Sequence, residues 1–260
     1  MKCCICGTVR NCGKYLNNIF SIMERIGTLF EDYKIILYYD LSTDNTLENL
    51  NNYSKKNKNV ILIINTEPLL KYRTHRIALG RNKCLKTMRE QFTDYDYFIM
   101  MDCDDRCNYK IKLKLLKSYL LRRDWDGLSF NHPAGYYDTW ALSKKPFVVS
   151  CHNFKDNTLG QKYICNIIKR TPSHKLIRCL SAFNGFSIYR TNKFENCWYD
   201  GHFRLDYIPA KNILENIKIA GGIVSSELNV NQDCEHRFFH FSAVKKHNAK
   251  IMISPLCLFV

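Results

Sequence analysis

Two spacings of apolar residues alternate along the first half of the chain. Short apolar runs at 1–9, 34–39, 60–64 and 97–101 predict buried strands. The segments 14–30, 44–53, 73–92 and 111–121 instead carry apolar residues at helical spacing, as Leu16, Ile19, Phe20 and Met23 do in the first of them. Repeated strand–helix units predict an α/β fold with a mostly parallel sheet and right-handed crossovers.

The second half of the chain is less regular. Residues 127–131 and 147–150 predict strands, 181–189 a hairpin or strand containing Gly185, and 208–219 a helix. No linker, repeat or low-complexity tract divides the chain. A single core can extend over roughly 250–300 residues, so we expect one domain over residues 1–260.

Acidic residues stand at the ends of two predicted strands. Asp40 ends the second strand, and Asp102-Cys103-Asp104-Asp105 ends the fourth. Ligands of such sheets bind outside the carboxyl ends of the strands. Adjacent carboxylates repel one another unless a divalent cation neutralises them, so Asp104 and Asp102 are predicted ligands of Mn²⁺ or Mg²⁺. The alternative is that Asp104 or Asp105 caps the helix at 111–121.

Helix capping also offers a simple explanation for the residues after Asp40. Ser42 or Thr43 can cap the helix at 44–53, and Asp44 is as readily a cap as a ligand. Downstream, Arg76 and Arg81 lie five apart on a predicted helix, where they can reach phosphate oxygens or the acidic cluster. A solvated basic face is the alternative.

The order of these motifs resembles that of a known class of enzymes. An Asp after the second strand and D-x-D after the fourth resemble the nucleotide-sugar glycosyltransferases of the GT-A fold. Three blocks further resemble the fungal capsule-associated α-1,3-mannosyltransferases and their giant-virus relatives: R-x-x-R-I-A-x-x-R-N at 73–82, Y-Y-D-T-W-A-L at 136–142, and D-C-E-H-R-F-F-H at 233–240 with a strand toward a proline at 250–255. Ser143-Lys144 departs from that group, which typically has an arginine after A-L.

The resemblance implies a GT-A fold, a mixed and mostly parallel sheet flanked by helices. Residues 1–109 would bind the sugar nucleotide and residues 110–260 the acceptor. It also implies roles on the donor side: Asp40 beside the nucleotide base, Arg10 and Asn11 on the nucleotide, and Arg76, Arg81 and Asp102 near the diphosphate.

On the acceptor side, the resemblance assigns substrate binding to Tyr137, Asp138 and Trp140. His236 and His240, which face one way if they lie on a helix, are predicted to complete the metal shell. An inverting enzyme would use Asp233 or Glu235 as general base. The named relatives are retaining, which favours retention.

The net charge and the composition of the chain bear on the kinds of partner that it could bind. The chain has a formal net charge of +15, which fits a phosphorylated substrate, nucleic acid or an anionic membrane. Lys, Asn, Ile and Tyr are abundant throughout, so part of the excess reflects composition bias. No recognisable nucleic-acid motif is present, and we expect no specific nucleic-acid partner.

Thirteen scattered cysteines and the absence of a leader or an apolar run of about 18 residues favour free thiols and a cytoplasmic location. For a viral protein that location would be the host cytoplasm or the virion. Cys3-x2-Cys6 is only half of a zinc-site spacing. The sequence leaves the oligomeric state open.

These features together predict a metal-dependent glycosyltransferase that moves a sugar from a UDP- or GDP-sugar to a glycan or other hydroxyl acceptor. The alternatives are a basic nucleic-acid-binding protein and a catalytically inactive GT-A binding module. A sugar nucleotidyltransferase is disfavoured, because residues 6–10 lack the glycine-rich loop that such an enzyme needs.

Overall fold

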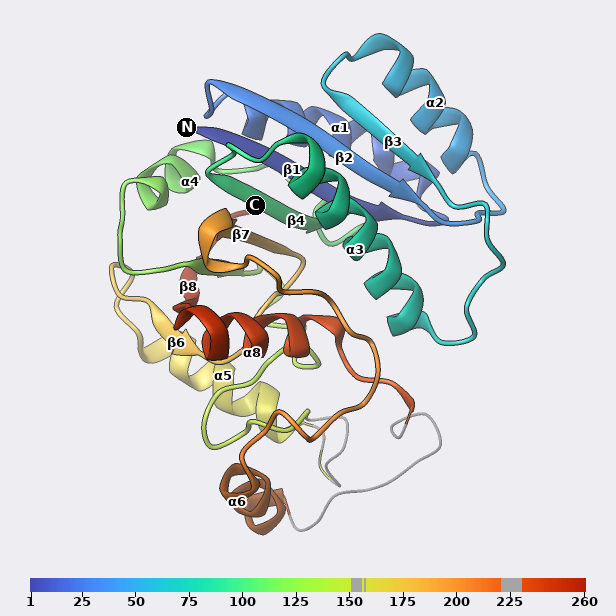
Figure 1. Ribbon diagram of the computed structural model, residues 1–260. Coiled ribbons are helices and arrows are strands. Elements are labelled where there is room, and N and C mark those ends of the chain that lie inside the picture. The colour runs from blue at the N-terminus through green and yellow to red at the C-terminus, as the bar shows by residue number, and fades with distance from the viewer. Residues whose placement is uncertain (151–155, 157, 221–230) are drawn as a thin grey trace.

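The computed structural model describes residues 1–150, 156, 158–220 and 231–260, and one sheet organises them (Figure 1). Its strands are β1 (Lys2–Val9), β2 (Asp32–Tyr39), β3 (Val60–Ile64), β4 (Tyr97–Asp102), β5 (Gly127–Asn131), β6 (Ile177–Cys179), β7 (Phe186–Arg190) and β8 (Ile251–Cys257). The helices are α1 (Gly13–Gly27), α2 (Thr46–Lys56), α3 (Arg73–Gln91), α4 (Leu113–Leu120), α5 (Leu159–Arg170), α6 (Ala210–Ala220) and α8 (Glu235–His247), with a 3₁₀ turn, η2 (Thr191–Lys193).

The strand order is β3-β2-β1-β4-β7-β5-β8-β6. The first four are parallel, β7 runs antiparallel to both β4 and β5, β8 is parallel to β5, and β6 is antiparallel to β8. This is the predicted α/β fold with a mixed, mostly parallel sheet. The register pairs Thr8 with Asp102 and Val9 with Tyr39, so the ends of β1, β2 and β4 share one edge.

The central strand β4 is buried on both faces, which explains its unbroken apolar run. In β4, Tyr97, Ile99 and Met101 join one apolar cluster while Phe98 and Met100 join another. Side chains of α1, α2 and α4 belong to the first cluster, and those of α3, α5 and α8 belong to the second. The sheet is therefore sandwiched between two helical layers, with α3 and α8 on the same face (Figure 1).

Some expected elements differ from the structure. Residues 147–150 form no strand, and the β-pairing of Phe147 is an isolated bridge to Lys144. The sequence patterns also failed to indicate α5 and β6.

The helix caps expected at Asp104 or Asp105 and at Ser42 or Thr43 are also wrong. The helix predicted over 111–121 begins at Leu113, too far along the chain for Asp104 or Asp105 to cap it. Likewise α2 begins at Thr46, and neither Ser42 nor Thr43 caps it. The Ser42 hydroxyl instead accepts a hydrogen bond from the Asn11 amide.

The cysteines in the described residues are all free thiols, and Cys151 lies outside those residues. Cys3 and Cys6 belong to the clusters on opposite faces of the sheet, so they cannot share a metal ion. Within the described parts of the chain, no helix has the length and apolar character needed to span a bilayer.

Gly80 sets how closely α3 approaches the sheet. A Cβ there would lie 2.5 Å from the Tyr38 ring and 2.8 Å from the Thr8 methyl group. Although alanine is the better helix former by about 1 kcal/mol, overpacking typically costs about 1–3 kcal/mol. We therefore expect Gly80→Ala to lower the free energy of unfolding, measured by urea denaturation. The exposed Lys83→Ala serves as the control on the same helix, expected to stay within about 0.5 kcal/mol. A Gly80→Ala protein as stable as the wild type would contradict this account.

Candidate active site

Two adjoining cavities lie at the carboxyl edge of the parallel strands. The first, of about 280 Å³, lies over the ends of β1, β2 and β4, and the second, of about 320 Å³, lies between the acidic cluster, the loop at 137–140 and the start of α8. Each is near the lower end of the range of about 300–1,000 Å³ for small-ligand sites. The cavities share one wall, which consists of Arg73, Ile77, Arg81, Asp102 and Asp104.

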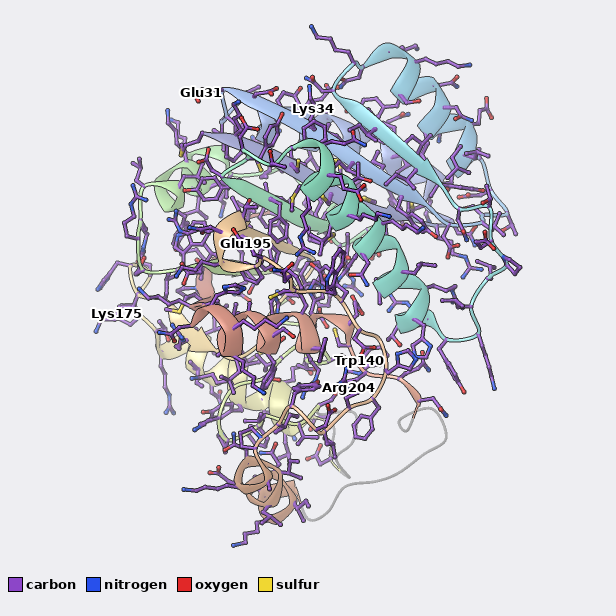
Figure 2. All side chains as sticks on the ribbon, in the orientation of Figure 1. Glu31, Lys34, Trp140, Lys175, Glu195 and Arg204 are labelled. Carbon is purple, nitrogen blue, oxygen red and sulfur yellow. The ribbon has the colours of Figure 1, made fainter. Side chains whose placement is uncertain are left out.

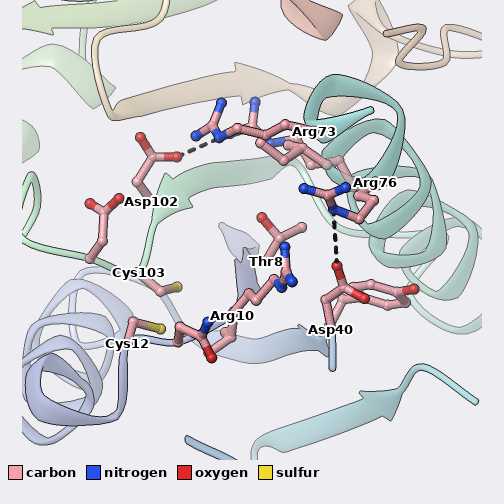
Figure 3. A pocket seen from close by; sticks show the side chains of 14 residues that line it. Thr8, Arg10, Cys12, Asp40, Arg73, Arg76, Asp102 and Cys103 are labelled. Carbon is pink, nitrogen blue, oxygen red and sulfur yellow. Dashed lines mark hydrogen bonds and ion pairs between the residues drawn. The ribbon is translucent and has the colours of Figure 1, made fainter. Parts of the chain in front are cut away.

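The end of the first cavity that lies away from the shared wall contains the predicted nucleotide-binding residues Asp40, Arg10 and Asn11 (Figure 3). The Asp40 carboxylate lies 3.9 Å from Arg76 Nε and accepts a hydrogen bond of 3.0 Å from Asn65 Nδ2. Arg76 also donates to the Leu70 carbonyl at 2.6 Å. Burial, followed by the charge of Arg10, lowers the pKa of Arg76.

Arg10 and Asn11 both line this cavity, yet both also hold the neighbouring loop. Arg10 Nε donates to the Leu41 carbonyl, and Asn11 Oδ1 accepts from the Thr43 amide at 2.8 Å. Their side chains thus shape the cavity, and Asn65 is a polar neighbour of Asp40 that the sequence motifs did not reveal.

The acidic cluster provides two carboxylates to the shared wall. Burial, followed by the charge of Asp104, raises the pKa of Asp102 to about 8. Burial also raises the pKa of Asp104, whose Oδ1 accepts a hydrogen bond from the Arg106 amide. Cys103, between them, is buried in the apolar cluster below, and its Sγ occupies the space where a Cβ on Gly7 would lie. Each carboxylate thus lies where a neighbouring positive charge would stabilise its ionised form.

Arg81 connects the two halves of the chain. Its guanidinium donates to Asp102 Oδ1 at 3.0 Å and to Glu235 Oε1 at 2.5 Å, and it also contacts His236 Nε2. Burial alone would lower the pKa of Arg81, but the charges of Glu235 and Asp102 outweigh it and raise that pKa. The predicted phosphate ligand is therefore a permanently charged bridge between two carboxylates.

Tyr137, Asp138 and Trp140 all line the second cavity. Asn184, which sequence reasoning missed, holds this loop: its Oδ1 accepts the amides of Tyr137 at 3.0 Å and Asp138 at 3.1 Å. The next residue, Gly185, accepts the Asp102 amide at 2.8 Å. Both have positive φ, 72° and 87°, and the Asn-Gly pair in the sequence was the available signal for such a turn.

The two histidines of α8 have different surroundings. His236 lines the second cavity, and its Nδ1 is buried without a hydrogen-bond partner among the described residues. His240 has Ser181 Oγ at 2.9 Å from Nδ1 and Tyr189 OH at 3.0 Å from Nε2, so both ring nitrogens are engaged. We therefore retain only His236 as a proposed metal ligand.

The two predicted general bases also differ. Glu235 lines the second cavity but is paired with Arg81. Asp233 lines neither cavity, is 2% exposed, and accepts a hydrogen bond of 2.9 Å from Arg237 Nε. Because Arg237 also donates to the Leu142 carbonyl, this pair fixes the segment that follows the aromatic loop.

The donor atoms of the shared wall suit a hard divalent cation. Among the described residues, no three His, Cys, Asp or Glu side chains are grouped to hold a metal by themselves. Protein sites for Mg²⁺ commonly supply only one or two carboxylates, with substrate phosphates as further ligands. Asp102 and Asp104 fit that pattern, provided that a bound diphosphate completes the shell.

The family model for glycosyl transferase family 2 matches residues 4–187, and the chain belongs to this family. The expectation of a glycosyltransferase with a GT-A fold is thereby confirmed at the level of the family. The finer resemblance to fungal capsule and giant-virus enzymes stays a prediction.

The chain is also similar to solved structures, at low sequence identity. S. aureus TarS 1-349 in complex with UDP-GlcNAc is 14% identical, with a TM-score of 0.49, over 100% of this chain and 58% of that one. The mannosyltransferase PcManGT from Pyrobaculum calidifontis, in complex with GDP-Man and Mn²⁺, is 12% identical, with a TM-score of 0.42, over 87% of this chain and 55% of that one. The chain thus matches little more than half the length of either protein. No curated protein matches the sequence.

The Arg81 bridge should contribute strongly to stability. Removing one partner of a buried ion pair costs about 3–5 kcal/mol, because it leaves buried charge uncompensated. We expect Arg81→Met to lower the free energy of unfolding by that amount in urea denaturation. Adding Glu235→Gln should then cost less than it does in the wild-type background. A double-mutant cycle with no coupling energy would contradict the bridge.

Proposed function

We propose that this protein transfers a sugar from a nucleotide-diphospho-sugar, a UDP- or GDP-sugar, to a hydroxyl group of a glycan or similar acceptor, with Mn²⁺ or Mg²⁺. The observation that carries this proposal is the wall shared by the two cavities. It presents the carboxylates of Asp102 and Asp104 to both cavities, between a basic side and an aromatic, acidic side. A reaction that joins two substrates at one point needs such an arrangement.

The donor would occupy the first cavity. Asp40, which Asn65 holds through a hydrogen bond, offers a carboxylate to the nucleotide, with Arg10 and Asn11 at the same end. The diphosphate would lie nearer the shared wall. Arg73 is exposed there and its side chain has no ion pair or hydrogen bond within the described residues, so its charge is available to phosphate oxygens.

Asp102 and Asp104 would hold the cation together with the diphosphate, and His236 is a further proposed ligand. When bound, the cation stabilises the charge that develops on the departing diphosphate. Arg81 keeps Asp102 oriented at the wall, and Arg76 adds positive charge beside Asp40.

The acceptor would occupy the second cavity. Asp138 can accept hydrogen bonds from sugar hydroxyls, and Tyr137 and Trp140 supply flat apolar surface. The resemblance to the fungal mannosyltransferases and their viral relatives makes mannose one donor sugar to test, while Ser143-Lys144 distinguishes this acceptor side. The cytoplasmic location, in a host cell if the protein is viral, stays a prediction.

The basic nucleic-acid-binding alternative is less well supported. The sequence carries no recognisable nucleic-acid-binding motif, and the three labelled cations Lys34, Lys175 and Arg204 lie at separate places on the molecule (Figure 2). Duplex binding would need basic residues gathered on one face. An inactive binding module is also less well supported, because acidic, basic and aromatic side chains all line the two cavities.

A thermal-shift panel tests this function. We expect one sugar nucleotide among UDP-glucose, UDP-GlcNAc and GDP-mannose to raise the melting temperature with Mn²⁺ and much less without it. Asp104→Ala should abolish the metal-dependent shift and sugar-nucleotide turnover. Asp124→Asn, which changes a surface carboxylate paired with Arg122, is the control and should keep both.

Two outcomes would count against the proposal. Unchanged turnover in Asp104→Ala would remove the metal-site assignment. A flat panel, together with tight and salt-sensitive binding of duplex DNA, would favour the nucleic-acid-binding alternative.

A further inference from the structure

We propose that the protein docks on a membrane surface rich in anionic phospholipids through four lysines before and on α4. We call Lys110, Lys112, Lys114 and Lys117 the lysine face. The net charge of +15 fits several kinds of anionic partner, and the lysine face offers one of them a defined place on the molecule. This inference goes beyond the proposed function and does not depend on it.

Positive charge is concentrated in this part of the chain. Residues 106–123 contain seven lysines and arginines and no acidic residue. The acidic residues on either side are already paired, Asp105 with Arg106 at 3.8 Å and Asp124 with Arg122 at 2.5 Å. The acidic residues that flank the lysine face in the sequence therefore do not neutralise its charge.

The lysine face is also open to partners outside the protein. All four of its lysines are exposed, and none of their side chains forms an ion pair or a hydrogen bond within the described residues. By contrast, Lys2 pairs with Asp94 and Lys86 pairs with Glu90. Ammonium groups without a protein partner are free to attract anionic groups in solution or on a surface.

Local structure turns the lysine face away from the core. Residues 110–112 pair with the segment 258–260 as extended chain, and Ile111, between the first two lysines, is 2% exposed. Alternation along extended chain therefore turns both of those lysines outward. Lys114 and Lys117 lie three apart on one side of α4. Because Ile111 and the buried residues of α4 belong to one apolar cluster, all four lysines lie on the outer side of that cluster.

Two exposed apolar side chains flank the lysine face. Leu121, four residues after Lys117, is 77% exposed, and Tyr109, directly before Lys110, is 41% exposed. Such side chains gain by entering the boundary between lipid headgroups and acyl chains, beside lysines that attract anionic headgroups. The phosphates of a nucleic-acid duplex would attract the lysines but offer no apolar region to Leu121. Charge and apolar exposure together favour a lipid surface.

The position of α4 lets the lysine face meet a surface without a change in the fold. The helix lies at one edge of the molecule (Figure 1). Tyr119 fixes it from the buried side, because its hydroxyl lies 2.7 Å from Ser254 Oγ and its carbonyl accepts a hydrogen bond of 3.0 Å from Trp125 Nε1. Clusters of about four to eight basic residues on an amphipathic helix are typical of proteins that bind anionic lipids.

Co-sedimentation with lipid vesicles tests the proposal. The protein is mixed with phosphatidylcholine vesicles that either contain or lack phosphatidylserine. We expect binding only to the vesicles that contain phosphatidylserine. Raising the salt from about 0.1 M to about 1 M, which shortens the Debye length from about 10 Å to about 3 Å, should weaken that binding strongly.

Lysine variants assign the binding to the lysine face. The triple variant combines Lys112→Gln, Lys114→Gln and Lys117→Gln. Each lysine near an anionic surface contributes about fivefold to the affinity, so this variant should lower the partition coefficient by about 10²-fold. Lys114→Gln alone should lower it about fivefold, and this variant carries the test if the triple variant is unstable.

Two further proteins separate the lysine face from net charge and test its apolar edge. The control triple variant removes the same number of charges at and just after the end of α2, on exposed residues, by Lys55→Gln, Lys56→Gln and Lys58→Gln. It should stay within about threefold of the wild-type partition coefficient, because these lysines would not touch the membrane. Leu121→Ser should lower the partition coefficient by at least about threefold, because it removes apolar contact with the lipid.

Several outcomes would overturn the proposal. They are the absence of binding to phosphatidylserine vesicles, equal losses in the two triple variants, and an unchanged partition coefficient in Leu121→Ser. Duplex DNA that displaces the protein from the vesicles at an equal concentration of phosphate groups would assign the lysine face to nucleic acid instead. Because sugar transfer is not measured, each of these outcomes leaves the proposed function standing.

Discussion

The buried guanidinium of Arg81 is the interaction on which the site depends. It joins Asp102 at the end of β4 to Glu235 at the start of α8, residues far apart in the sequence. Each of the three charges would be costly to bury alone, whereas together they compensate one another. Because Arg81 stands on α3, the bridge fixes α3, the acidic strand end and α8 relative to one another. It also forms part of the wall between the two cavities, so the same contact that stabilises the fold separates the two proposed substrates.

The sheet topology explains why a second cavity exists beside the first. The parallel strands β1, β2 and β4 bring Asp40 and Asp102 to one edge, as in any open α/β sheet. The antiparallel strand β7 then enters beside β4 through the left-handed turn of Asn184 and Gly185. That turn binds the Asp102 amide on one side and the Tyr137–Asp138 loop on the other. A change of strand direction thus places the aromatic loop against the acidic cluster.

Much of the fold could be predicted from local pattern, but the state of the site residues could not. β3 and β5 were predicted with their observed bounds. Strands buried on both faces give unbroken apolar runs, as β4 does. The acidic cluster was predicted because it ends such a run. Whether a carboxylate is free or paired depends on distant arginines: Arg81 and Glu235 are 154 positions apart, and Arg237 with Asp233 is buried by the segment from Leu142 to Val148. Residue type and spacing along the sequence do not predict those contacts. Asn184 escaped notice because its role comes from side-chain acceptance of two backbone amides across the fold.

The polar groups around the two cavities differ in whether other protein groups already bind them. Around the first cavity, Asp40, Arg76 and Arg10 are already held by protein groups, which fits a rigid surface for one fixed ligand. Around the second cavity, Arg81, His236 and Tyr137 keep buried atoms without protein partners, and Asp138 keeps a carboxylate without a cation among the described residues. Such atoms are stable only when a polar ligand or water supplies the missing hydrogen bonds. The protein therefore pairs polar groups more completely at the Asp40 end of the first cavity than around the second.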